Sequence, residues 1–174
     1  MYTIRPMTIE DYDEVFAMWQ ITSKRALSSA DERPQIERYL KRNEGLSLVA
    51  VADGKIVGTV LAGHDGRRGF IHHMAVRPEY RRRHIGHALA EKAIENIGAE
   101  GIEKTHIFCY QNNETGQKFW SDFGFEKRDD VYIFSYKHRN EGKHEHKGKR
   151  LKVHYAHLRQ VRRGAEKRQG RYSL

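Results

Sequence analysis

Three consecutive arginines, Arg81–Arg83, form the part of the chain whose residue types and spacing best define a chemistry. They follow a stretch of strand-forming side chains, Phe70–Val76, and precede a helical pattern in which Leu89, Ala93 and Ile97 recur every four residues. The first turn of a helix has backbone N–H groups without partners and the positive end of the helix dipole, so it binds anions. Guanidinium groups bind phosphate as planar forks with several donors. The segment therefore predicts a pyrophosphate site.

A longer motif surrounds these arginines. It reads Val76-x-Pro78-x-Tyr80-Arg81-Arg-x-x-Ile85-Gly86-x-x-Leu89 and resembles the acetyl-CoA signature of the GNAT N-acetyltransferase superfamily. The core of that signature is Gln/Arg-x-x-Gly-x-Gly/Ala, which matches Arg81 to Gly86 here, with His84 in place of the first glycine. A histidine at this position must bring its backbone close to phosphate, and its ring can add a donor to the anion.

A second motif follows a stretch typical of a buried strand, residues 105–111. It reads Asn113-x-x-Gly116-x-x-x-Trp120-x-x-x-Gly124-Phe125. It resembles the second signature of the same family, with Gly116 for the usual alanine and Trp120 for the usual tyrosine. The two motifs stand in the expected order, and the resemblance spans residues 2–137.

The resemblance implies a mixed, mostly antiparallel central sheet, splayed between its fourth and fifth strands and flanked by helices, the GNAT fold. It implies acetyl-CoA as co-substrate and direct attack of an amine through a tetrahedral intermediate, without an acyl-enzyme. A backbone N–H of residues 74–76 is expected to polarise the thioester carbonyl. The expected cofactor-binding residues are Met74, Ala75, Val76, Arg81, Arg82, Arg83, His84, Ile85, Gly86, His87 and Asn113.

The sequence patterns agree with such a fold. Asp53-Gly54 between two apolar stretches predicts a tight hairpin. Strands are expected at residues 2–5, 46–52, 56–62, 70–76, 105–111 and 131–136, and helices at 8–23, 34–42, 88–99 and 114–122. Together they predict a mixed α/β domain over residues 1–137.

Two residues are candidates for catalysis. His72 lies four residues before the valine of Val-x-Pro, where some GNAT enzymes that act on arylalkylamines resemble this chain with a histidine. It could accept a proton through water, or it could only form hydrogen bonds within the sheet. His72 and His73 are adjacent on a strand, so we expect their side chains to face opposite sides. Trp120 can donate a hydrogen bond to the thioester sulfur but cannot act as an acid at neutral pH; Tyr110 or Tyr132 could replace it.

The acceptor is expected to be a primary amine of a small molecule or a peptide. The resemblance places its binding site across the cleft from coenzyme A, where Trp19, Asp31, Glu32 and Tyr132 are candidates, each with a purely structural role as the alternative. A carboxylate in the 31–32 loop would favour a cationic acceptor such as a polyamine, an aminoglycoside or a peptide N-terminus.

The positive charge is concentrated at one end of the chain. The formal net charge is +9, and residues 137–174 hold 13 Lys and Arg against 3 Asp and Glu, which leaves residues 1–136 with a net charge of −1. We expect residues 138–174 to be a basic tail, with a short helical pattern at residues 151–161. The alternative function is a catalytically weak or inactive acyl-CoA-binding module whose tail associates with RNA or ribosomes.

The composition also bears on the expected location, assembly and metal binding of the protein. The chain has one cysteine, Cys109, and lacks a signal-peptide pattern or an apolar stretch that could span a bilayer, so we expect a cytoplasmic monomer or homodimer without membrane association. Cys109 is expected to be buried as a small apolar side chain. No carboxylate or cysteine cluster accompanies His144 and His146, so no metal site is expected.

Overall fold

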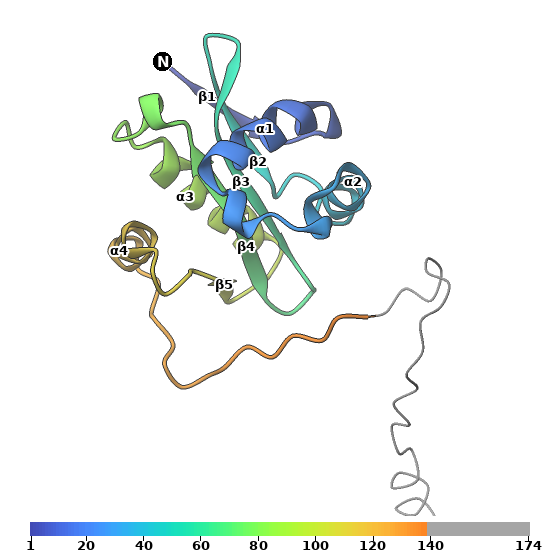
Figure 1. Cartoon of the computed structure of the whole chain (residues 1–174), viewed down its shortest axis with the longest axis vertical. Helices are drawn as coiled ribbons and strands as arrows, with labels where there is room; N and C mark the ends of the chain where they lie inside the picture. Colours follow the sequence, from blue (N-terminus) through green and yellow to red (C-terminus); the bar gives the residue numbers. More distant parts are fainter. Residues whose placement is uncertain (139–174) are drawn as a thin grey trace, which may run out of the picture. The chain divides into compact units, whose positions relative to one another are not determined.

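The computed structural model describes residues 1–138. The chain divides into two compact units, Met1–Arg128 and Asp129–Leu174. The first unit contains every helix and strand assigned within residues 1–138. Figure 1 shows this unit as a sheet with helices around it. The proposed tail therefore lies outside the described residues, apart from His138.

The first unit is built on one five-stranded sheet with the strand order β1-β2-β3-β4-β5. The strands are β1 (Thr3–Pro6), β2 (Leu48–Ala52), β3 (Lys55–His64), β4 (Gly69–Val76) and β5 (Thr105–Ile107). The first four pair antiparallel, and β4 pairs parallel with β5. The connection from β4 to β5 passes through a helix, as parallel pairing requires. The expected mixed, mostly antiparallel sheet is confirmed.

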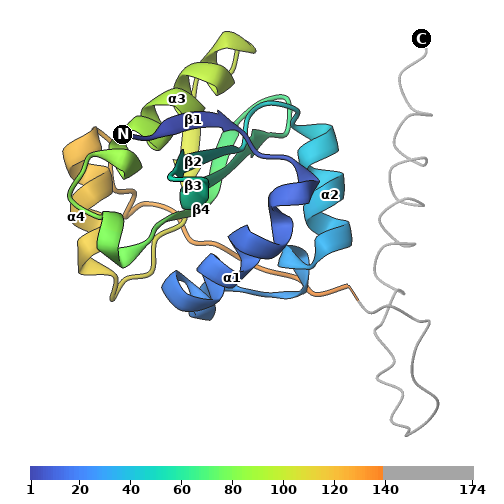
Figure 2. The same cartoon turned by 90° about the horizontal axis from the view of Figure 1, so that it is seen from above.

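Helices cover both faces of the sheet. Helices α1 (Tyr12–Thr22) and α2 (Arg33–Arg42) lie on one face, and α3 (Ile85–Ala99) and α4 (Glu114–Phe123) lie on the other (Figure 2). Two apolar cores result, one on each face. Val15, Met18 and Trp19 belong to the core under α1 and α2, whereas Leu89 and Trp120 belong to the core under α3 and α4. No helix of residues 1–138 is long and apolar enough to cross a membrane.

The hairpin predicted at Asp53-Gly54 is present between β2 and β3. Both residues have positive φ, 51° for Asp53 and 72° for Gly54. Two positive values in a two-residue loop are typical of the type I′ turn, whose twist matches that of the strands it joins. Asp tolerates this conformation and glycine adopts it readily, which explains why these two residues stand there.

The sheet opens between β4 and β5. On β4, the parallel pairing covers only residues 69–71. β4 continues to Val76 and remains paired with β3 along this length. Residues 72–76 therefore have no partner strand on the β5 side within the described chain. This is the splay that the family resemblance implies.

β4 also contains a β-bulge. Leu61 pairs with His73, but the next residue of β3, Ala62, pairs with Ile71. His72 is therefore an extra residue on β4 that no residue of β3 opposes. A bulge of this kind changes which face the neighbouring side chains occupy.

The prediction of a last strand is wrong. Residues 131–136 are not assigned to a strand, and β5 ends at Ile107 rather than at residue 111. Val131, Ile133 and Phe134 are exposed. Their side chains favour strands, but a strand also needs a neighbour for its backbone groups, and no pairing is found for these residues within the described chain.

Candidate functional site

The loop after β4 is held in place by its own backbone and by two arginines. The backbone N–H of Arg77 donates to the carbonyl of Val57, and its Nε donates to the carbonyl of Ile56 at 2.7 Å. A one-turn 3₁₀ helix, Pro78–Tyr80, follows. Nε of Arg81 then donates back to the carbonyl of Val76 at 3.1 Å. The loop between β4 and α3 is therefore anchored at its start.

Two residues of this loop adopt the left-handed conformation. Arg82 has φ of 62° and His84 has φ of 60°. His84 occupies the position of the first glycine in the family signature, and it keeps the backbone conformation that glycine adopts without strain. For a residue with a Cβ atom this conformation costs roughly 1–2 kcal/mol. The departure from the signature thus changes the side chain but preserves a backbone conformation accessible to glycine.

The side chains around the start of α3 fit a polyanion. Arg81, Arg82 and Arg83 are exposed, and none of them forms an ion pair with a carboxylate of residues 1–138. Arg83 lies over the ring of Tyr80 at 5.1 Å from its centroid. His84 precedes the helix but forms no side-chain cap. The first N–H groups of α3 are therefore available to a ligand.

Gly86 leaves space beside these N–H groups. A Cβ atom added there would meet Val76, Met74 and Phe119 at 3.6–3.8 Å, which is ordinary van der Waals contact. The fold does not require glycine at this position. A larger side chain would instead extend into the region between β4, α3 and α4, where the sequence places the ligand. Ile85, in contrast, is buried and packs into the core under α3, and His87 contacts the ring of Phe123 at 4.9 Å.

The open edge of β4 offers backbone donors next to this loop. Because the N–H of Arg77 points to β3, and successive N–H groups of a strand point to opposite edges, those of Met74 and Val76 point away from β3. Their side chains pack against the core under α3. Ala75 faces the other core, under α1 and α2. The strand thus presents two N–H groups that have no partner strand within residues 1–138, where a carbonyl or an amide could bind.

His72 and His73 face the same side of the sheet, so the expectation of opposite sides is wrong. His72 contacts the ring of Tyr39 on α2 at 5.5 Å, and His73 stacks on Trp19 of α1 at 4.6 Å. The bulge causes this, because the extra residue shifts the alternation of β4. Ile71 belongs to the core under α3, whereas Ala75 belongs to the core under α1 and α2.

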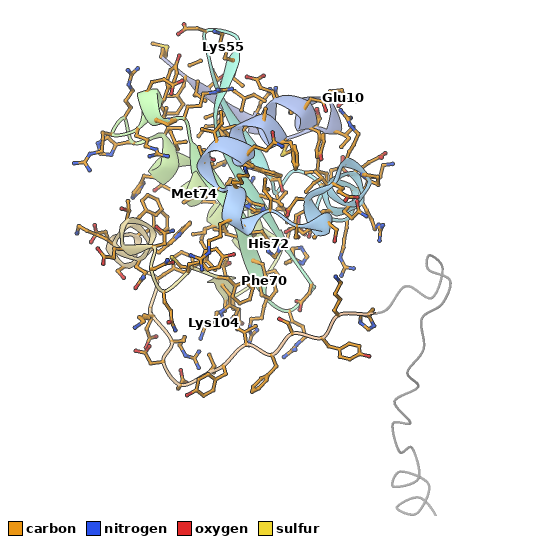
Figure 3. All side chains as sticks on the ribbon, in the orientation of Figure 1. Glu10, Lys55, Phe70, His72, Met74 and Lys104 are labelled. Atoms are coloured by element: carbon orange, nitrogen blue, oxygen red, sulfur yellow. The ribbon has the colours of Figure 1, made fainter. Side chains whose placement is uncertain are left out.

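His72 is exposed to solvent as a residue, but its ring is crowded by aromatic neighbours. Besides Tyr39, it stacks on Phe70 at 6.0 Å. Phe70, His72 and Met74 follow one another along β4 in Figure 3. Partial burial lowers the pKa of the His72 imidazole, and the nearby His73 lowers it further, whereas Asp31 has the opposite effect. A lower pKa favours the neutral imidazole, which is able to accept a proton.

Asp31 and His73 form a buried pair that the sequence did not reveal. Nε2 of His73 lies 2.8 Å from Oδ1 of Asp31, and the side chains are 7% and 8% exposed. Oδ2 of Asp31 accepts a hydrogen bond from the backbone N–H of Ser28 at 2.7 Å. Both carboxylate oxygens are thus occupied, which leaves Glu32, on the surface, as the accessible carboxylate of this loop.

Trp19 completes this buried cluster. Its Nε1 donates to Oγ1 of Thr59 at 3.0 Å, and the residue is fully buried. Trp19 and Asp31 were candidates for acceptor binding or for structure, and their contacts are structural. The residues involved lie 42 positions apart in the pair Asp31–His73 and 40 in the pair Trp19–Thr59. No local motif could have indicated them.

The second motif forms the start of α4. Oδ1 of Asn113 accepts a hydrogen bond from the N–H of Gly116 at 3.0 Å, which caps the helix. A Cβ atom on Gly116 would collide with the end of the Asn113 side chain, so the alanine that the family has here would require that side chain to shift. Nearby, Arg25 donates to Asn112 at 3.0 Å and lies over the ring of Tyr110.

Trp120 is buried among aromatic rings. It contacts Phe119 at 4.9 Å and Phe125 at 5.1 Å, in the core under α3 and α4. These contacts show a packing role, and its contact with a thioester stays a prediction. Tyr132 lies in the second unit and is exposed. Cys109 is partly buried, which raises the pKa of its thiol.

No group of three or more His, Cys, Asp or Glu side chains suitable for a metal ion occurs within residues 1–138. His144 and His146 lie outside the described residues.

Comparison with solved structures shows the same fold in several acetyltransferases. The aminoglycoside N-acetyltransferase AAC(6')-Iy, solved with a bisubstrate analogue containing coenzyme A, has a TM-score of 0.65 and 19% identity, covering 79% of this chain and 99% of its own. PaiA N-acetyltransferase from Thermoplasma acidophilum, in complex with coenzyme A, has a TM-score of 0.66 and 20% identity, covering 75% and 93%.

A third similar structure is named for a protein substrate. The ribosomal-protein-S18-alanine N-acetyltransferase from Escherichia coli has a TM-score of 0.63 and 19% identity, covering 74% of this chain and 79% of its own. At the level of sequence, residues 10–125 match the model of the Acetyltransferase (GNAT) family. The match includes the open edge of β4, the arginine loop and the start of α4. This chain belongs to the GNAT acetyltransferase family.

Proposed function

We propose that the protein transfers an acetyl group from acetyl-CoA to a primary amine of a small molecule or a peptide, by direct attack in a ternary complex. One observation carries the proposal: the open edge of β4 leads directly into a loop with three exposed arginines that form no ion pair within the described chain, and into a helix N-terminus without a side-chain cap. A linear ligand with polar amides at one end and a diphosphate at the other fits this sequence of donors. Acetyl-CoA is such a ligand.

The chain would hold acetyl-CoA through backbone and side-chain donors. The N–H groups at the start of α3 and the guanidinium groups of Arg81–Arg83 would bind the diphosphate. The N–H groups of Met74 and Val76 would bind the pantetheine arm and polarise the thioester carbonyl. Asn113 already caps α4 through Oδ1, so its Nδ2 is the group that would be left for the pantetheine arm.

His72 is the proposed general base. Its lowered pKa favours the neutral ring, so it can take a proton from the acceptor ammonium through water. The amine nitrogen then forms a bond to the carbonyl carbon, which gives a tetrahedral intermediate, and the nitrogen releases a second proton to solvent. The carbonyl re-forms as the carbon–sulfur bond breaks, and the electron pair leaves with sulfur. The thiolate takes its proton from solvent, because Trp120 in the position of the family tyrosine has no acidic proton at neutral pH. Positioning of the two substrates can supply about 7–11 kcal/mol of the barrier reduction.

The acceptor is proposed to be a primary amine, without a narrower chemical class. Similar structures include enzymes named for aminoglycosides and for the alanine terminus of a ribosomal protein. In this chain Asp31 is occupied by His73 and Ser28, which leaves Glu32 as the loop carboxylate that would meet a cationic acceptor. Binding of a nucleic acid by residues 138–174 and a cytoplasmic location remain proposals from composition.

The proposal is tested by release of free thiol from acetyl-CoA in the presence of a panel of amines: an aminoglycoside, a polyamine and a peptide with N-terminal alanine. Turnover with at least one amine, formation of the acetylated product by mass spectrometry, and loss of both in Gly86→Glu would support it. Tight binding of acetyl-CoA without turnover on any amine would overturn the proposal and favour a binding module.

A further inference from the structure

The Asp31–His73 pair is the most deeply buried histidine–carboxylate contact in the described chain, and the acetyl transfer proposed above does not use it. Asp31 ends the one-turn 3₁₀ helix Ser29–Asp31, and His73 lies in the middle of β4. The pair therefore joins the connection between α1 and α2 to the central strand. Buried ion pairs often contribute little net stability compared with apolar residues of similar size. The effect of the Asp31–His73 pair on the geometry of β4 is therefore more informative than its effect on stability.

His73 is fixed on three sides. Asp31 accepts from its Nε2, the indole of Trp19 lies 4.6 Å from its ring centre, and its backbone pairs with Leu61. Trp19 is itself fixed by Thr59 of β3, and Asp31 by Ser28. These contacts hold the imidazole of His73 in one orientation, with Nε2 towards Asp31.

His72, next to it, is not fixed in this way. It is the extra residue of the bulge, so β3 supplies no opposing residue. Within the described chain its imidazole has ring contacts with Tyr39 and Phe70 but forms no hydrogen bond. A bulge can re-aim the side chains beside it, so the direction of His72 depends on how its neighbours on β4 are held. The residue that is held most firmly beside the bulge is His73.

The bulge also sets the open edge of β4. Met74 and Val76, whose N–H groups point away from β3, follow the bulge directly. If the extra residue moved by one position, the residue at 73 would leave Asp31 and Trp19. The Asp31–His73 contact therefore opposes this slip.

We propose that Asp31 and His73 form a positioning pair that pins the β4 bulge and thereby orients the imidazole of His72 towards the acceptor side of the sheet. This inference rests on the proposed function for its catalytic consequence, but its structural content stands apart from turnover. The titratable groups that face His72 are Tyr39 from α2, His73 from β4 and Asp31 from the 3₁₀ helix.

The test compares His73→Leu, His73→Gln and the wild-type full chain. Long-range ¹H–¹⁵N spectra of the histidine rings, assigned with His72→Gln, report the ring environment and the pKa of His72. Leucine removes the bond to Asp31, so the His72 resonances should move and kcat should fall about 10-fold, with KM for acetyl-CoA changed less than about 2-fold. Glutamine keeps a donor for Asp31 but cannot become charged. It should restore most of kcat, while the pKa of His72 rises towards its ordinary value of about 6.5.

A matched control is available at the C-terminal end of β3. His64 and Glu100 form a second histidine–carboxylate pair, 2.7 Å apart but partly exposed, which joins β3 to the end of α3 rather than to the connection between α1 and α2. His64→Gln should leave the His72 resonances and kcat unchanged.

The outcomes separate the two proposals. Unchanged His72 resonances and pKa in the folded His73 variants would overturn the positioning pair, even if the variants lost activity. If His73→Leu did not fold, the His72 resonances in His73→Asn, whose side chain is too short to reach Asp31, would decide in the same way. If the wild type acetylated no amine, the proposed function would fail, and the spectra would still show whether His73 positions His72.

Discussion

The loop that follows β4 and the cluster beneath α1 and α2 flank the same strand but are built in opposite ways. The loop uses residues that are close in sequence, and its guanidinium groups are exposed and form no ion pair within the described chain. The cluster joins Asp31, His73, Trp19 and Thr59 from four distant segments, and the polar groups that join them are hydrogen-bonded and buried. Donors in the loop that form no ion pair are available to a ligand. The hydrogen-bonded groups of the cluster hold β4, the strand whose open edge is proposed to bind that ligand. The comparison predicts that changes in the loop affect binding and changes in the cluster affect stability.

The largest effect is expected from Asp31→Ala. Removal of the carboxylate leaves His73 without its partner in a buried place and frees the N–H of Ser28, so the free energy of unfolding should fall by about 3 kcal/mol. Denaturant unfolding measures this loss. The comparison also requires that the dissociation constant of acetyl-CoA, measured on the folded variant by calorimetry, change less than about 3-fold, or 0.7 kcal/mol. A large loss of binding without a loss of stability would contradict the division between the two regions.

Gly86→Glu should have the reverse profile. The structure has space for a Cβ atom at Gly86, so the fold should persist. A carboxylate at the start of α3 would meet the diphosphate, and binding should weaken at least 100-fold, about 2.7 kcal/mol.

The matched control for this variant is Gly98→Glu on the same helix, where a Cβ atom meets nothing within 4 Å. It adds the same charge away from the loop and should bind acetyl-CoA like the wild type. Equal thermal stabilisation of Gly86→Glu and Gly98→Glu by acetyl-CoA would show that the ligand lies elsewhere.

His72→Ala tests the chemistry on the strand between the two regions. Loss of a general base should lower kcat at neutral pH about 10- to 100-fold. Because partial burial lowers the pKa of His72, the wild-type rate should rise with pH through a transition below the ordinary histidine value of about 6.5 and be level above it. The variant should lack this transition. A pH–rate profile of kcat that kept the same acidic limb in His72→Ala would exclude His72 as the base.

The smallest effect is expected from His84→Gly. His84 has φ of 60°, a conformation that glycine adopts without steric cost, so relief of strain should stabilise the folded chain. Glycine also increases the freedom of the unfolded chain, which offsets part of the gain. We expect a net change in the free energy of unfolding of about +0.5 kcal/mol, with acetyl-CoA binding retained. A clear loss of binding in thermal-shift titrations would show that the His84 side chain contacts the ligand.

Features with a local cause could be predicted from the sequence. Asp53-Gly54 determines a turn through the conformations of those two residues. The strand and the helix between residues 70 and 99 could be predicted because each has its own periodicity, and the arginine loop because it lies between them. The splay between the fourth and fifth strands followed from the resemblance to the family, and the pairing of β4 with β5 confirms it.

Features that depend on distant partners could not be predicted. Burial alternates without a break along β4, with Ile71, His73 and Ala75 all buried. Both faces of this strand are covered, so a change of face leaves no trace in the hydrophobic pattern. The bulge at His72 was therefore missed, and with it the common face of His72 and His73. The strand expected at residues 131–136 failed for a related reason, since apolar side chains do not specify a pairing partner.

The bulge has a consequence for how one strand can serve two neighbours. Ile71 packs towards α3 where β4 adjoins β5, and Ala75 packs towards α1 where β4 is free on that edge. A single inserted residue thus acts as a phase shift of half a period between the two halves of the strand. Deletion of His72 would remove this shift. The side chains of residues 69–71 would then point to the opposite faces of the sheet, Ile71 would face the core under α1 and α2, and β5 would lose its pairing with β4, although every remaining residue would be unchanged.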